Sequence, residues 1–169
     1  LKSGQIYMDL NSTSPMVKQA IAEVVNPTGA RFVEVAVMDG VPGKNHSVPM
    51  LLVGAAAADV ITALEPYGVD MREFGTEYGR AAATKMFRSV LVKGIEALTA
   101  ECFLAAARAG VADEVAHSLD ASQTDMGWRD QARYNAERMT THGIRRAAEM
   151  REVAKTLTDL GITAEMTRG

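Results

Sequence analysis

Proline occurs only in the first part of this chain: the sequence has 169 residues, and Pro66 is the last of its five prolines. Proline fixes its own φ angle and lacks the N–H that helix and sheet interiors need, so it marks turns, strand ends and helix starts. Long uninterrupted helices are therefore expected only after Pro66. The chain is predicted to have an α/β part followed by an all-α part.

Short apolar runs alternate with helix-forming segments up to residue 74. The run 31–37 is rich in β-branched residues, which is typical of a buried strand. Ser14 followed by Pro15 predicts a helix start, with serine as the N-cap. We expect strands at 6–10, 31–37, 49–54 and 69–74, and helices at 15–25 and 56–64. Because ligands of α/β sheets bind beyond the carboxyl ends of strands, a site is expected at the loops 11–14 and 38–44.

The proline-free part is predicted to be helical. Its first helix is expected from about Thr76 to Ala109, with small and large apolar residues around most of its circumference. Such a helix is buried around most of its surface, and one domain of this size can hardly surround it, so a partner subunit is expected. Gly110 and Gly161 are expected to end helices. Two further helices are expected at 112–119 and 128–160.

Composition argues against several classes of protein. Apolar residues make up 47% and charged residues 23%, as in folded proteins, and a net charge of -3 argues against a nucleic-acid partner. Charges interrupt the apolar run 103–115, so no membrane span is expected. The single cysteine, Cys102, is predicted to be a buried thiol in a cytoplasmic protein. His46 has no metal ligand beside it in the sequence, so no metal site is expected.

Lys85 is the first candidate for chemistry. It is expected within the long helix among the apolar residues Ala82, Ala83, Met86 and Phe87. Burial there would lower the pKa of the lysine and suit it to proton transfer near neutral pH. The alternative is a lysine at the solvent edge.

An arginine-rich segment is the second candidate. Residues 128–151 contain six arginines and no lysine, and the guanidinium group binds carboxylate or phosphate through paired hydrogen bonds. Arg138, His142 and Arg145 fall on one helix face, which would suit an anionic substrate. The alternative is an exposed face of Arg–Glu pairs.

Several motifs follow one another in order along residues 1–122: Met8–Pro15, Phe32–Val37, Leu51–Gly54, and Gly75–Gly79 with Lys85 after it. Together they resemble the β-hydroxyacid dehydrogenase superfamily, which includes 3-hydroxyisobutyrate and 6-phosphogluconate dehydrogenases. The remainder, with Arg138–Met139 and Arg145–Met150, is similar to the helical domain of its phosphogluconate dehydrogenase-like branch.

The resemblance implies a specific domain organisation. Residues 1–74 would be the C-terminal portion of a Rossmann NAD(P)-binding domain, joined through a long buried helix to a 6-phosphogluconate dehydrogenase-like helical domain at 75–169. It also implies NAD or NADP as cofactor and a homodimer formed through the helical domain. The G-x-G-x-x-G turn of such proteins would lie upstream of Leu1, so we expect this chain to be part of a longer dehydrogenase and to be inactive alone.

The resemblance also implies roles for single residues. Lys85 matches the superfamily's catalytic lysine, the general base that takes the hydroxyl proton as hydride leaves for the nicotinamide. Ser12 and Thr13 match a Ser-Thr pair at the nicotinamide and substrate end of the cleft, and Asn11 beside them is expected to bind the cofactor.

Two departures from the superfamily pattern bear on the substrate. Met38-Asp39-Gly40 stands where many members have a Ser-Gly-Gly substrate loop, and Arg88 and Ser89 stand in place of two asparagines. Arg88, one turn from Lys85, favours an anionic substrate and would lower the pKa of the lysine by repulsion. The expected substrate-binding residues are Ser12, Thr13, Arg88, Ser89, His142, Arg145 and Arg146.

The leading hypothesis is an NAD(P)-dependent oxidoreductase that moves hydride between nicotinamide and a small anionic hydroxy acid or its keto form. One alternative is an imine or ketone reductase of the same fold, in which the lysine is commonly replaced. The other is a helical dimerisation module without activity of its own.

Overall fold

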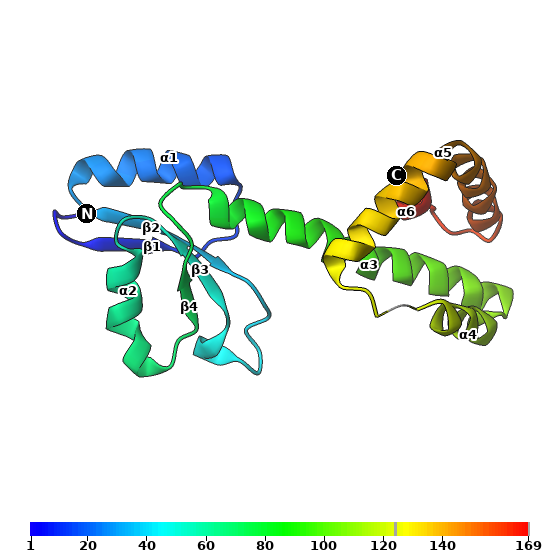
Figure 1. Cartoon of the computed structure of the whole chain (residues 1–169), viewed down its shortest axis with the longest axis horizontal. Coiled ribbons are helices and arrows are strands. Elements are labelled where there is room, and N and C mark those ends of the chain that lie inside the picture. Colours follow the sequence, from blue (N-terminus) through cyan, green and yellow to red (C-terminus); the bar gives the residue numbers. More distant parts are fainter. Residues whose placement is uncertain (124, 169) are drawn as a thin grey trace. The chain divides into compact units, whose positions relative to one another are not determined.

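The computed structural model describes residues 1–123 and 125–168, and the side chains of Trp128, Arg129, Arg146, Glu149, Glu152 and Lys155 lie outside the described part (Figure 1). The chain forms two compact units, Leu1–Leu91 and Val92–Gly169. The two units meet within one long helix, whereas the sequence suggests a boundary between residues 74 and 75. The domain assignment stays a prediction, and each unit is described by itself.

The first unit is built on a four-stranded sheet with the order β1-β2-β3-β4. Its strands are β1 (Ile6–Asp9), β2 (Arg31–Val37), β3 (Met50–Val53) and β4 (Met71–Glu73). The pairs β1–β2 and β3–β4 are parallel, and β2–β3 is antiparallel. Because β1 and β2 are parallel neighbours, the loops that follow them leave the sheet at the same edge.

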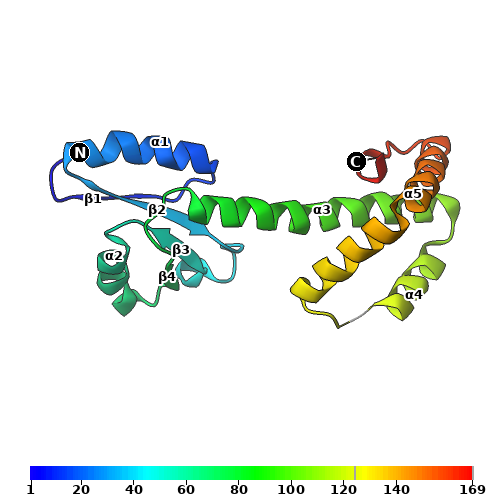
Figure 2. The same ribbon diagram turned by 45° about the horizontal axis from the view of Figure 1, so that its top comes forward.

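Helices cover both faces of this sheet (Figures 1 and 2). The helix α2 (Ala57–Leu64) packs with Val33, Val35 and Leu52 of the strands. On the other face, α1 (Pro15–Val25) packs against Phe32. Strand residues therefore alternate between two apolar layers, as the period of a strand requires.

Capping residues set the helix ends in this unit. The Ser14 Oγ accepts a hydrogen bond from the Val17 N–H at 3.4 Å, with Pro15 in the first turn, as predicted. The carboxylate of Glu34, fully buried in β2, accepts hydrogen bonds from the Gly79 N–H at 2.5 Å and the Ala82 N–H at 2.7 Å. Glu34 thereby satisfies backbone donors at the start of α3 (Arg80–Ala109) and fixes that helix to the sheet.

The remainder is helical, as predicted. Its α-helices are α3 (Arg80–Ala109), α4 (Ala112–Ser122), α5 (Trp128–Asp159) and a short α6 (Glu165–Arg168) that the sequence analysis missed. Three short 3-10 helices, also not predicted, lie in the first unit: η1 (Asn26–Thr28), η2 (Asn45–Ser47) and η3 (Glu65–Tyr67). Gly110 and Gly161 follow α3 and α5 with φ angles of 73° and 71°, a conformation that glycine adopts most easily.

The fold class is confirmed: a small mixed sheet is followed by a mostly helical region. As expected for so small a chain, it does not bury α3 around most of its circumference, since Phe87 is 74% and Val90 75% exposed, while the small residue Ala105 faces inward. The prediction that Cys102 is buried is wrong, because its side chain is exposed. Among the described residues, no helix is both long and apolar enough to cross a membrane.

Candidate functional site

The loops after β1 and β2 and the first turns of α3 come together in the first unit. Ser12 lies in the loop after β1, and its Oγ accepts a hydrogen bond of 2.7 Å from the Nζ of Lys85, 73 positions later in the sequence. Lys85 is half-buried on α3. The structure therefore places an amino group and a hydroxyl group in contact at the sheet edge where α/β proteins bind ligands.

A buried ion pair holds the loop after β1. The Nζ of Lys18 lies 2.8 Å from the Asp9 carboxylate and 2.9 Å from the Asp9 carbonyl oxygen, and both side chains are 1% exposed. Asn11 donates to the same carboxylate through its backbone N–H at 3.1 Å and its side-chain amide at 2.6 Å. This network fixes the direction in which the chain leaves β1 and so the position of Ser12.

The pKa of Asp9 reflects the same network. Burial by itself raises the pKa of this carboxyl. Hydrogen bonds from Lys18 and Asn11, together with the charge of Lys18, lower the pKa by more than burial raises it, so the pKa lies below its ordinary value. Sequence reasoning missed this pair. The available signal was the spacing of Lys18, Ala22 and Val25, four and three residues apart, which puts the lysine on the buried face of α1.

Thr13 carries a buried hydroxyl with which a bound group could pair. Its Oγ1 is buried and has no hydrogen-bond partner among the described residues. A buried polar atom without a partner is costly, so a bound group that pairs with it would be favoured. The chain contains no G-x-G-x-x-G turn, the pattern that holds a pyrophosphate, so its residues could hold only another part of a dinucleotide.

Charged side chains gather around the loop after β2. The Asp39 carboxylate accepts hydrogen bonds from the Lys44 Nζ and, at 2.8 Å, from the Gly40 N–H. The hydrogen bond from Lys44 is the main cause that lowers the pKa of Asp39 below its ordinary value, helped by Gly40 and by the positive charges of Lys44 and Arg88. Arg88 of α3 therefore acts electrostatically on Asp39, in the loop that stands where many superfamily members have Ser-Gly-Gly.

The other predicted site residues have different surroundings. The Oγ of Ser89 donates to the Lys85 carbonyl at 2.9 Å, within α3. His142 and Arg145 are exposed residues of α5, in the second unit, and the side chain of Arg146 lies outside the described residues. The structure thus joins Lys85 to Ser12 within one unit, while the roles of His142, Arg145 and Arg146 remain predictions. In the described ranges no group of three His, Cys, Asp or Glu side chains could hold a metal ion.

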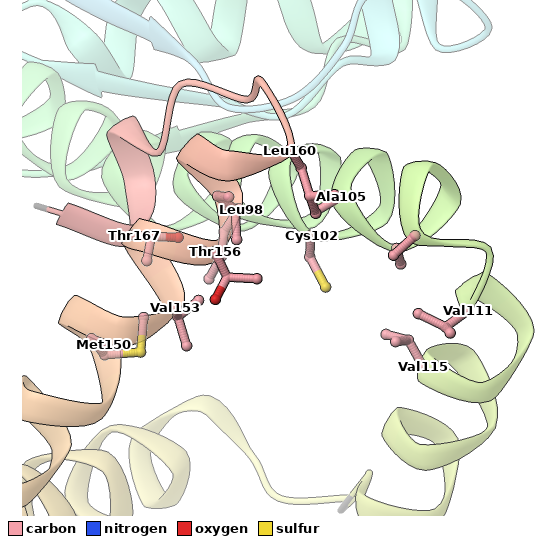
Figure 3. A pocket seen from close by; sticks show the side chains of 13 residues that line it. Leu98, Cys102, Ala105, Val111, Val115, Met150, Val153, Thr156, Leu160 and Thr167 are labelled. Carbon is pink, nitrogen blue, oxygen red and sulfur yellow. The ribbon is translucent and has the colours of Figure 1, made fainter.

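The second unit contains an apolar cavity of about 410 Å³. Figure 3 shows Cys102 of α3 pointing into it, with Met150 and Val153 of α5 on one side and Val111 and Val115 on the other. Cys102 is therefore exposed to this cavity, which is lined almost entirely by apolar atoms.

Comparison with known proteins gives related sequences. Residues 106–169 match the model of a domain of unknown function, DUF1932. The mitochondrial 3-hydroxyisobutyrate dehydrogenase of Drosophila melanogaster is 26% identical over 126 residues, which are 73% of this chain and 39% of that protein. The chain spans less than half the length of the curated relatives it matches, 39% and 45% of two of them.

Solved structures share the fold of the whole chain. A conserved hypothetical protein of Sinorhizobium meliloti is 38% identical over 96% of this chain and 55% of that chain, with a TM-score of 0.60. A conserved protein described as structurally similar to 3-hydroxyacid dehydrogenases is 30% identical over 96% of this chain and 61% of that one, with a TM-score of 0.61.

Imine reductases have the same fold at low sequence identity. The Myxococcus stipitatus enzyme, solved in complex with NADP+, is 13% identical over 98% of this chain and 64% of that chain, with a TM-score of 0.70. The chain therefore shares its fold with hydroxyacid dehydrogenase-like proteins and imine reductases, which confirms the resemblance to the β-hydroxyacid dehydrogenase superfamily that its motif order indicated.

Proposed function

We propose that this chain belongs to an NAD(P)-dependent oxidoreductase that moves hydride between nicotinamide and a small hydroxy acid or its keto form. The contact of 2.7 Å between Lys85 Nζ and Ser12 Oγ carries this proposal. A lysine held by a hydroxyl at the carboxyl edge of parallel strands can exchange a proton with a substrate oxygen bound between them.

In this reaction the chain's own residues handle the proton. During oxidation, Lys85 takes the hydroxyl proton while the hydrogen on the same carbon leaves as hydride; during reduction, Lys85 returns the proton to the carbonyl oxygen. Ser12 orients the substrate oxygen and the lysine toward each other. A bound nicotinamide would accept or supply the hydride, and Asn11, Ser12 and Thr13 would hold it. NAD and NADP are both compatible with these residues.

An assay of reductase activity tests this function. We expect the natural polypeptide that contains this chain to oxidise NADH or NADPH in the presence of short keto acids, and more slowly with cyclic imines. The retained lysine supports this preference. A higher kcat/KM for cyclic imines than for every keto acid would instead favour the imine reductase alternative, which the shared fold supports.

We also propose that the natural protein is a homodimer, because one chain leaves apolar side chains of α3 exposed: Phe87, Val90, Leu91, Ile95 and Leu98. Sedimentation velocity is expected to show a dimer whether or not NAD(P) is present. Val90→Glu should produce monomers, whereas Val24→Glu on α1, a valine with 73% exposure against 75% for Val90, should leave the dimer intact. A dimer that survives Val90→Glu would contradict this interface.

A further inference from the structure

Glu34 stands in the middle of an otherwise apolar strand face. Side chains of β2 alternate between the two faces of the sheet, so Glu34 points to the same side as Phe32 and Ala36. Phe32 packs with residues of α1, and Ala36 packs with Ala81 of α3. Glu34 is fully buried on this face, and a buried carboxylate is costly unless hydrogen bonds compensate for its lost hydration.

The hydrogen bonds of Glu34 cap α3. Gly79 directly precedes this helix and is its N-cap, since its carbonyl oxygen accepts the first helical hydrogen bond, and Ala82 is the third helical residue. The Oε2 of Glu34 accepts from the Gly79 N–H at 2.5 Å, and its Oε1 accepts from the Ala82 N–H at 2.7 Å. These are the two N–H groups that side chains of the helix itself satisfy in a capping box. Here one carboxylate supplies both hydrogen bonds from β2.

A capping side chain does not fit at Gly79 itself. The φ angle of Gly79 is 94°, a conformation that glycine adopts most easily. A Cβ at this position would lie 3.0 Å from the Cβ and 3.1 Å from the carbonyl oxygen of Pro15, the first residue of α1. Beside it, the Gln19 side-chain amide donates to the Tyr78 carbonyl at 3.1 Å. The start of α3 is therefore packed against the start of α1, directly after the loop that carries Ser12.

We propose that Glu34 is a positioning residue for proton transfer: by capping α3 from β2, it holds the Lys85 Nζ within hydrogen-bond distance of the Ser12 Oγ. The inference rests on the proposed function and adds a residue that acts through Lys85. Lys85 follows Ala82 by three residues and so lies on the same side of α3. A displacement of about 1 Å at a catalytic group can lower a rate on the order of 10²-fold.

Kinetics of Glu34→Gln in two backgrounds test this role. Glutamine is of similar size but has one acceptor oxygen, so it cannot accept from both N–H groups. We expect kcat of the natural protein to fall about 10–100-fold, with KM and the dissociation constant for NAD(P) little changed. In the Lys85→Met background the same substitution should lower the residual rate by less than about twofold, because no lysine is left to position. An equal factor in both backgrounds would indicate a purely structural role and overturn the proposal.

Glu101→Gln is the matched control. Glu101 lies in the second unit, and its carboxylate likewise accepts from two backbone N–H groups, those of Met166 and Thr167, both at 3.0 Å. Glu101→Gln should lose stability but keep the wild-type kcat. Glu34→Asp keeps the charge and is one methylene shorter, so it should fold and show the pattern of Glu34→Gln with a smaller loss of kcat. Equal losses of kcat in Glu34→Gln and Glu101→Gln would also overturn the proposal.

A thermodynamic cycle keeps this inference separate from the proposed function. Urea denaturation gives the free energy of unfolding of Ser12→Ala, Lys85→Met and the double variant, each in the wild-type and the Glu34→Gln background. In the wild-type background the loss in the double variant should be smaller than the sum of the single losses, because both remove one hydrogen bond. With Glu34→Gln the losses should be additive. These results are expected even if turnover is absent with every keto acid, which alone would refute the proposed function. The same coupling in both backgrounds would overturn the role of Glu34 even where turnover is intact.

Discussion

Replacement of Lys85 by methionine is expected to lower kcat of the natural protein by about 10²–10⁴-fold, the usual contribution of a positioned general acid or base. Methionine retains much of the length and apolar stem of lysine but cannot accept or donate the proton. The dissociation constant for NAD(P) should change little, because the proposed role of the lysine is toward the substrate oxygen. Steady-state kinetics and cofactor titration measure the two effects separately.

The matched control is Lys93→Met, which removes an exposed lysine from the same helix and should leave kcat unchanged. Ser12→Ala is expected to have a smaller effect than Lys85→Met, because the serine orients the lysine but does not carry its proton. Wild-type turnover in Lys85→Met, with an intact fold, would exclude Lys85 as the proton-transfer residue.

Replacement of Lys18 by methionine is expected to cause the largest loss of stability, about 3–5 kcal/mol in the free energy of unfolding. The substitution leaves the Asp9 carboxylate buried without its cation, and burying an uncompensated charge is strongly unfavourable. Since the same network positions Ser12, activity should fall as well. Urea denaturation followed by circular dichroism measures the loss.

Two further variants show whether the loss of stability in Lys18→Met comes from the buried charge of Asp9. The double variant Asp9→Asn/Lys18→Met should recover much of the stability, because it removes the buried charge with its partner. Arg31→Met breaks an exposed ion pair with Asp59 and should cost no more than about 1 kcal/mol. If Lys18→Met were no more damaging than Arg31→Met, the buried pair would not stabilise the fold.

The dependence of stability on pH follows from the same carboxyl. The pKa of Asp9 in the folded protein lies below its ordinary value. The ionised carboxylate therefore stabilises the folded state above the unfolded pKa of about 3.9, and this stabilisation is lost as the pH falls through the lower folded pKa. Wild-type stability should therefore fall more steeply in acid than that of the double variant. Parallel acid profiles for the two proteins would contradict this assignment.

The alternation of strands and helices could be predicted from the sequence because local signals agree there. Ser14 and Pro15 start α1 at the predicted residue, β2 spans the predicted run 31–37, and Gly110 follows α3 as expected. In each case a residue with a strong local preference coincides with a change in apolar pattern. The superfamily resemblance assigned Lys85 and Ser12 to one cleft but did not predict their hydrogen bond, because residues 73 positions apart carry no local signal of proximity.

Other features depend on contacts that apolar pattern alone does not encode. The long helix is apolar around most of its circumference, and the apolar pattern does not say which side one chain covers: Ala105 and Ala106 are buried, whereas Phe87 and Val90 are exposed. The carboxylate of Glu34 lies in an apolar strand, and its partners are backbone N–H groups near the start of α3. The pairing of Asp39 with Lys44 depends on the exact turn between them, which composition of the loop does not specify.

Transfer of deuterium from labelled NAD(P)H to a keto acid tests the central claim, that Lys85 and Ser12 form the proton-transfer centre of an NAD(P)-dependent reductase. The wild-type natural protein should place deuterium on the carbinol carbon of the hydroxy acid, and Lys85→Met should bind the same cofactor but form almost no labelled product. Equal labelled product from the two proteins, or none from the wild type with any keto acid, would contradict it.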